Sequence, residues 1–290
     1  MSAALLESLV SGSLERCAGR IEQRAGGVWS FALENGKRLP ASAQIREGWA
    51  ELRVPLTDRL DPDLPWSLLR ANGTLRGPAR FVRHDDRRVG LHAEVAVDNS
   101  ELASVRIAGA YRSLRAAEAA RQKEGLGSEG LGSEGLGTEG LGTAEPFAPW
   151  DRLSEEFGWK VTTRDGGQMG IELDAPGLMN QAFLEERGGE PLVAIELLRG
   201  TALSIPSQRA IGRFLLGLTG RLRLARGAVR SDPEAIRLEV AVPFGPPAST
   251  QELDLALEAL SLACRLSSRE VRALGQEPLA RAYLAHQEGL

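Results

Sequence analysis

Two stretches of the sequence, FVRHDDRRVGLHAEVAV at Phe81–Val97 and AVRSDPEAIRLEVAV at Ala228–Val242, share one pattern. Each has a short apolar arm, a charged turn and a second arm in which apolar and polar residues alternate, which is typical of a β-hairpin. The tetrapeptide Glu-Val-Ala-Val closes both, at Glu94–Val97 and Glu239–Val242, and the second hairpin is two residues tighter at its turn. The chain therefore carries one strand–turn–strand unit twice.

The repeat extends upstream and downstream in the same order. LLRANGTLR at Leu68–Arg76 matches LLGLTGRLR at Leu215–Arg223, and both lie just before the repeated hairpins. Further upstream, Trp29 opens a hairpin with an Asn-Gly turn and Trp159 opens one with an Asp-Gly turn, the strongest short hairpin signals. Each copy then reads as helix, three strands, helix, two strands and a long helix. So many matches in one order indicate a tandem duplication.

A short-period repeat, EGLGSEGLGSEGLGTEGLGT, lies between the copies at Glu124–Thr143. It contains the frame Gly-x-Gly-x-x-Gly three times, which is the pattern of dinucleotide-binding turns. Such a turn follows a buried strand and opens a helix, whereas this stretch follows the polar tail of a predicted helix. We therefore predict no cofactor here and a flexible linker instead. The predicted domains are residues 1–123, a linker over 124–148, and residues 149–290.

The composition indicates a soluble globular protein. Hydrophobic residues make up 42% of the 290 residues and charged residues 26%, which suits a chain with a full core. A net charge of −4 and an aromatic content of 5% argue against a nucleic-acid partner, which needs excess Lys and Arg or a stacking platform. The sequence shows neither a signal peptide nor an apolar run of membrane-spanning length, so we expect no membrane association and a cytoplasmic location.

Few residues carry the chemistry of a catalytic or metal site. The chain has three histidines, His84, His92 and His286, and two cysteines, Cys17 and Cys264. We expect a solvated turn at His84, an exposed or half-buried strand position at His92, and two buried core thiols. No converging set is evident, so we predict no catalytic residue, no metal and no cofactor.

Two charged runs have open interpretations. Asp58, Asp61 and Asp63 form an acidic loop that resembles the start of a calcium loop but is interrupted by prolines. The arginines either contact an anionic partner or cover solvated strand faces; these are Arg87, Arg88, Arg221, Arg223, Arg226 and Arg230.

Two of the five tryptophans, Trp29 and Trp159, occupy equivalent places in the two copies. They are either core anchors of the two sheets or, where exposed, hot spots for a bound peptide. We take Trp29 and Trp159 as the candidate partner-binding residues.

The order of elements resembles the type III secretion chaperone fold, which is shared with the YbjN-like (bacterial sensory transduction regulator) family. The residues that carry the resemblance are the Leu-Leu helix end at Leu68, the hairpin Ala79–Val97 with the capped helix after it, and their counterparts from Leu215 to Leu266. It covers roughly Ser2–Lys123 and Pro149–Leu274. The resemblance implies an α+β protein of two tandem units, each a curved antiparallel sheet with helices on one face. Since these families are usually single units that dimerise, it also implies an intramolecular pseudo-dimer.

The expected function is that of a non-enzymatic, chaperone-like or regulatory adaptor protein. It would hold a segment of a partner protein on apolar sheet or helix surfaces, or by strand addition at a sheet edge. One alternative is an enzyme or small-ligand-binding protein that uses the cleft between the halves through carboxylates and arginines. Another is a module of a larger assembly in which the linker sets the reach of the two halves.

Overall fold

A computed structural model describes most of the chain. The described residues are 3–24, 27–35, 37–56, 63–84, 88–97, 100–123, 150–163, 169–173, 180–187, 190–199, 202–231, 234–242 and 250–289. The predicted linker at 124–148, Asp58 and Asp61 of the acidic loop, and Arg87 lie outside these residues.

The protein is of the predicted α+β class. The described residues form seven helices and two antiparallel sheets of six strands each. The chain divides into two compact units, Met1–Leu60 with Leu75–Ser133 and Asp61–Thr74 with Glu134–Leu290. None of the described helices is both long enough and apolar enough to cross a lipid bilayer.

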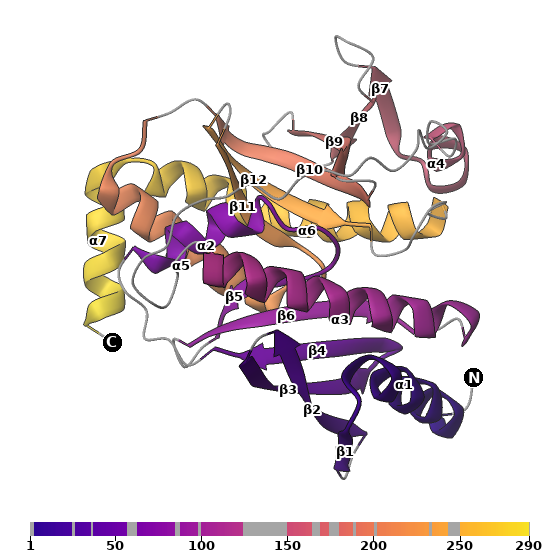
Figure 1. Ribbon diagram of the computed structural model, residues 1–290. Helices are drawn as coiled ribbons and strands as arrows, with labels where there is room; N and C mark the ends of the chain where they lie inside the picture. The colour runs from indigo at the N-terminus through magenta and orange to yellow at the C-terminus, as the bar shows by residue number, and fades with distance from the viewer. Residues whose placement is uncertain are drawn as a thin grey trace. The chain divides into compact units, whose positions relative to one another are not determined.

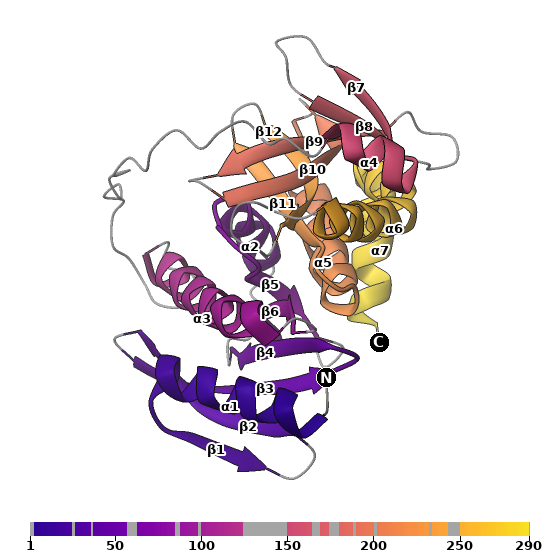
Figure 2. The ribbon, with the colours of Figure 1, turned by 90° about the vertical axis from the view of Figure 1, so that its right-hand side faces the viewer.

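The first unit has a sheet in the order β1-β2-β3-β4-β6-β5, with α1 and α3 packed against it (Figure 2). Its elements are α1 (Ala3–Ala18), β1 (Ile21–Arg24), β2 (Val28–Asn35), β3 (Lys37–Arg46), β4 (Trp49–Pro55), β5 (Arg80–Arg83), β6 (Val89–Ala96) and α3 (Ser100–Lys123).

The core of the first unit lies between the sheet and these two helices. Successive strand residues point to opposite faces, and the alternate residues Trp29, Phe31 and Leu33 of β2 are all buried. Phe31 meets Tyr111 of α3 with ring centroids 6.0 Å apart. The apolar face of β2 is therefore the helix-covered face of the sheet.

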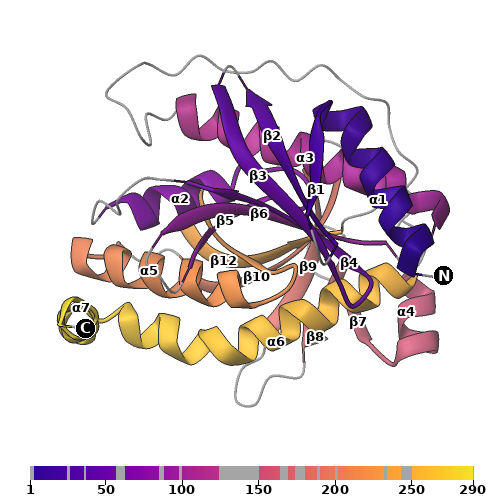
Figure 3. The ribbon, with the colours of Figure 1, turned by 90° about the horizontal axis from the view of Figure 1, so that it is seen from below.

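The second unit repeats this plan, with the sheet order β11-β12-β10-β9-β8-β7 (Figure 1). Its elements are α2 (Leu64–Asn72), α4 (Trp150–Phe157), β7 (Lys160–Thr163), β8 (Met169–Leu173), β9 (Asn180–Arg187), β10 (Glu190–Arg199), α5 (Ile205–Arg221), β11 (Arg226–Ser231), β12 (Glu234–Ala241), α6 (Thr250–Leu274) and α7 (Glu277–Glu288). Helix α6 packs on β10 and β12 and runs beside α5, with α7 at its carboxyl end (Figure 3).

Each sheet has one strand more than predicted ahead of its central helix. The prediction of three strands is wrong because it lacks β1 and β9. Strand β1 has a single apolar residue, Ile21, among its four, and its backbone is paired with β2. In β9 only Ala182, Phe183 and Leu184 are apolar, and polar residues on both sides of them leave too short an apolar run to indicate a strand.

The burial pattern of the two long helices supports the duplication. Buried positions of α3 recur in α6 at residue numbers 150 higher. The pairs are Ala103 and Leu253, Ile107 and Leu257, Ala110 and Leu260, Leu114 and Cys264, and Ala117 and Ser267. The two helices therefore present equivalent faces to their sheets.

Helix α2 belongs to the first sequence copy but packs in the second unit, against α5 and β11. Pro65 lies in its first turn, and Gly73 follows it directly. The contact is close because glycines face it. A Cβ at Gly212 of α5 would lie 2.9 Å from the main-chain nitrogen of Trp66, and one at Gly227 of β11 would lie 3.2 Å from Leu69 Cδ2.

Polar contacts fix both ends of α2. The Arg209 guanidinium of α5 donates to both carboxylate oxygens of Asp63, over 2.7 and 3.1 Å. At the other end the buried Asn72 amide donates to the Gly227 carbonyl over 2.9 Å. The predicted linker at 124–148 groups α2 with residues 1–123, whereas α2 packs in the second unit.

Candidate functional site

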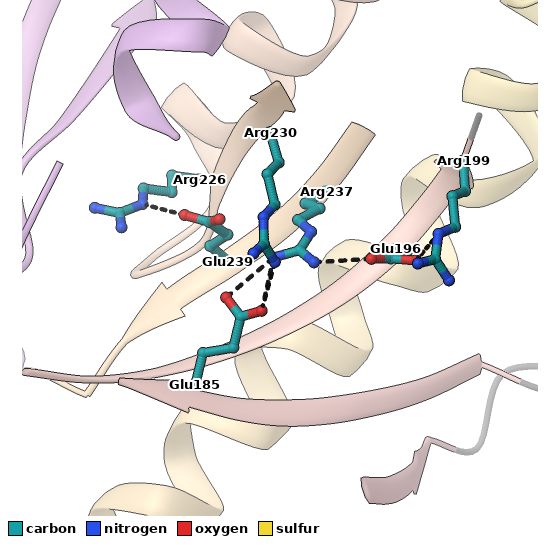
Figure 4. A network of polar contacts seen from close by, with 7 residues as sticks. All are labelled: Glu185, Glu196, Arg199, Arg226, Arg230, Arg237 and Glu239. Carbon is teal, nitrogen blue, oxygen red and sulfur yellow. Dashed lines mark hydrogen bonds and ion pairs between the residues drawn. The ribbon is translucent and has the colours of Figure 1, made fainter. Parts of the chain in front are cut away.

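The main polar cluster of the second unit lies on its sheet and centres on Arg237 of β12 (Figure 4). The Arg237 guanidinium donates to both oxygens of Glu185 on β9 over 3.0 Å and to Glu196 on β10 over 2.8 Å. Its carbon Cζ also lies 4.9 Å from the ring centroid of Phe183. Arg237 is buried, so its charge depends on these two carboxylates and the ring.

Neighbouring arginines share the same carboxylates. Arg230 of β11 donates to Glu185 over 3.0 Å, and Arg199 of β10 lies 3.7 Å from Glu196. Together with Arg237 they form a ladder across β9, β10, β12 and β11, in which each carboxylate meets two guanidinium groups.

A second buried ion pair joins the edge strand β11 to its neighbour β12. Arg226 Nε of β11 donates to Glu239 of β12 over 3.1 Å, and the two side chains are only 3% and 0% exposed. Glu239 belongs to the repeated Glu-Val-Ala-Val, and the equivalent Glu94 of β6 accepts from Arg80 of β5 over 2.7 Å. Each copy thus buries an arginine against the equivalent glutamate of the repeated tetrapeptide.

The two pairs come from different strand registers. Arg226 lies directly opposite Glu239, whereas Arg80 lies opposite His92, two residues before Glu94. The guanidinium reaches its carboxylate diagonally in the first copy and straight across in the second.

His92 is the most perturbed group of the first sheet. Burial, and then the nearby positive charges of Arg80, His84 and Arg53, lower the pKa of His92 from 6.5 to about 2. Within the described residues its Nε2 is buried without a hydrogen-bond partner. The expectation of an exposed or half-buried His92 is therefore wrong: the residue is buried on β6, opposite Arg53 of β4 and Arg80 of β5.

His84 also differs from its prediction as a solvated turn residue. It is half-buried, and its ring centroid lies 4.8 Å from that of His92. Gly90 makes room for it, because a Cβ there would lie 2.6 Å from His84 Nε2. Among the described residues no three His, Cys, Asp or Glu side chains converge as metal ligands.

The charged groups of both sheets are arranged for mutual neutralisation. Glu51 of β4 accepts from Arg53 and from Gln44, each over 2.7 Å, in the way that Glu185 and Glu196 accept from arginines. A carboxylate that already accepts hydrogen bonds from a guanidinium has that part of its acceptor capacity occupied. The arrangement therefore favours a structural role over acid–base chemistry.

The two candidate tryptophans occupy different environments. Trp29 has no exposed surface and lies in the core on β2. Trp159 is half-buried just before β7, and its indole nitrogen donates to Asp254 of α6 over 2.6 Å. Of the two, Trp159 is the one with surface to offer a partner.

Other predicted candidates are engaged or buried. Asp63 binds Arg209, which holds the pKa of its carboxyl below its usual range. Arg226 and Arg230 bind glutamates, as above, so they are not free for an anionic partner. Cys264 is buried as predicted, but Cys17 is half-buried, and burial raises the pKa of its thiol.

The apolar surface of the described residues has a different location from the charged clusters. Eight large apolar side chains are exposed, and all eight lie on helices: Leu5, Leu102, Val105, Phe157, Ile205, Leu262, Leu266 and Leu279. Two pairs stand one helical turn apart, Leu102 with Val105 on α3 and Leu262 with Leu266 on α6. Sequence reasoning missed these pairs because it followed the buried stripe of each helix; an extra apolar line outside that stripe was the available signal.

The comparisons with known proteins add no relative. No family model matches the chain, and the searches of curated proteins and of solved structures returned no match.

Proposed function

We propose that this protein binds a segment of a partner protein and acts as a chaperone-like or regulatory adaptor without catalysing a reaction. The observation that carries the proposal is the placement of exposed large apolar side chains on helices, away from the neutralised charges of the sheets. Exposed apolar surface that the fold does not use is typical of protein interaction sites.

The first unit offers one such surface on α3. Leu102 and Val105 are 41% and 62% exposed and lie one turn apart. Further along the same face, Gly109 adds no bulk, and Arg112 and Arg115 are exposed. An apolar pair followed by two arginines suits a segment whose apolar side chains are accompanied by carboxylates.

The resemblance to type III secretion chaperones agrees with this proposal, because such proteins hold segments of other proteins. The packing of α2 on α5 supports the further expectation that the two copies pair within one chain, since α2 and α5 are equivalent helices of the duplication. The enzyme alternative would use carboxylates together with arginines, and the carboxylates and arginines of Figure 4 are bound to one another.

A pull-down from the native host with mass spectrometry tests the proposal. The wild-type chain, the variant L102E/V105E and the control I205E serve as baits. Ile205 is also exposed but lies on α5, so we expect the wild type and I205E to capture the same protein and L102E/V105E to lose it. Recovery of no specific protein, or equal capture by L102E/V105E, would count against binding at α3.

A further inference from the structure

The outward face of α6 carries an apolar line that the second unit does not cover. Leu262 and Leu266 are 46% and 48% exposed, and the half-buried Leu255 continues the line two turns earlier. The spacings of seven and four residues place all three on one side of the helix, opposite the face that packs on β10 and β12.

The fold does not require these leucines. By the offset of 150 residues that relates the buried faces of the two long helices, Leu262 corresponds to Arg112 of α3 and Leu266 to Ala116. Helix α3 packs on its own sheet with a polar and a small residue at these positions. The packing of α6 on its sheet therefore does not account for these leucines.

The apolar line is bounded by opposite charges. Glu258 lies one turn before Leu262, and Arg269 lies three residues after Leu266 on the same side. Both are exposed, and within the described part of the chain neither makes an ion pair. The outward face of α6 is thus acidic before the leucines and basic beside and after them, since the exposed Arg265 lies between Leu262 and Leu266.

We propose that this face binds the same face of a second copy of the protein, with the two α6 helices antiparallel. Centred at Cys264, such a pair brings Leu262 of one copy against Leu266 of the other. Glu258 is six residues before the centre and Arg269 five residues after it, so each Glu258 lies beside Arg269 of the second copy. A parallel pair would set Glu258 against Glu258, so the charges select the antiparallel, two-fold arrangement.

The size of the surface sets the strength of the association. One helix from each copy gives an interface at the small end of specific complexes, with two salt bridges at its exposed rim. We therefore expect a dimer that forms at high protein concentration and weakens as salt screens the paired charges. The inference does not rest on partner binding at α3.

Sedimentation velocity of the full chain over a wide concentration range is the first measurement. The wild type is expected to shift from monomer to dimer. The variant L262R/L266A, which gives α6 the residues that α3 carries, is expected to stay monomeric with an unchanged circular dichroism spectrum. The control I205E should dimerise like the wild type. A wild type that is monomeric throughout, or a dimer that persists in L262R/L266A, would overturn the proposal.

Charge reversal identifies a second copy as the occupant. E258R places two arginines together at each end of the pair, and R269E places two glutamates together, so each variant alone is expected to be monomeric. Mixed in equal amounts, the two variants regain both salt bridges and should form a heterodimer. The double variant E258R/R269E should dimerise by itself. Failure of the mixture and of the double variant to associate would contradict antiparallel pairing.

Discussion

The side-chain amide of Asn72, the last residue of α2, donates a hydrogen bond to the main-chain carbonyl of Gly227 on β11 over 2.9 Å. The two residues are 155 positions apart in sequence, and Asn72 is fully buried. Asp63 and Arg209 hold the other end of the helix, so α2 of the first sequence copy is fastened into the second unit at both ends.

Replacing Asn72 should loosen this attachment. In Asn72→Ala the buried carbonyl of Gly227 loses a donor, and leaving a buried polar group unsatisfied costs about 1–3 kcal/mol. We expect a corresponding fall in the free energy of unfolding in urea. Ser67→Ala on the same helix is the control, since Ser67 makes only a 3.5 Å contact with the Asp63 carbonyl. Equal stability of the two variants would contradict the assigned role.

Glycines at the α2–α5 contact offer a matched pair of substitutions. Gly212 and Gly217 both lie in α5, but a Cβ at Gly212 would lie 2.9–3.0 Å from Trp66 and Pro65, whereas one at Gly217 meets nothing within 4 Å. We expect Gly212→Ala to destabilise the fold by about 1–3 kcal/mol through overpacking. Gly217→Ala should stabilise it by up to about 1 kcal/mol, because alanine is the better helix former. Thermal unfolding of the two variants measures both, and a shift of the same sign in both would be inconsistent with the close contact.

Local patterns predicted the elements of this fold better than their placement. The hairpins and the limits of α2 follow from turn residues and from the periodicity of apolar residues, which act over a few positions. The place of α2 depends on Gly212 and Gly227, whose missing Cβ atoms matter only once the helix is docked. A single glycine in a sequence does not reveal what approaches it.

The ion pairs of the sheets likewise could not be predicted from local sequence patterns. The repeated tetrapeptide marks Glu94 and Glu239 as equivalent, but their arginine partners depend on a register that the hairpin turns set. Glu185 and Glu196 meet Arg237 because β9, β10 and β12 are neighbours in the sheet, and this order is a long-range property of the fold.

A double-mutant cycle on Arg226 and Glu239 tests the buried pair. Glu239→Leu alone leaves the buried Arg226 without this carboxylate, and breaking a buried pair from one side costs about 3–5 kcal/mol. The double variant Arg226→Met/Glu239→Leu should cost clearly less than the sum of the two single variants. Urea unfolding of the four proteins gives the coupling energy.

Arg38 and Glu34 provide the comparison for this cycle. Their 3.3 Å pair has side chains that are 73% and 59% exposed, so water screens it and its coupling energy should stay below about 1 kcal/mol. A coupling energy for Arg226–Glu239 no larger than that for Arg38–Glu34 would contradict the expectation that burial strengthens the ion pair.

The environment of His92 predicts a loss of stability in mild acid. The folded state lowers the pKa of His92 from 6.5 to about 2, so between these values the unfolded chain binds a proton that the folded chain does not. The free energy of unfolding then falls as the pH is lowered below about 6.5, by up to about 1.4 kcal/mol per pH unit. Between pH 7 and pH 5 the contribution of His92 amounts to about 2 kcal/mol.

The substitution His92→Gln isolates this contribution from that of other groups, because glutamine does not titrate. Urea unfolding at pH 7 and pH 5 should show a smaller difference in His92→Gln than in the wild type. His286→Gln, at an exposed position on α7, should keep the full wild-type difference. If His92→Gln lost as much stability between the two pH values as the wild type, His92 would have to be protonated in the folded protein, and its enclosure beside Arg80 and Arg53 would not govern its charge.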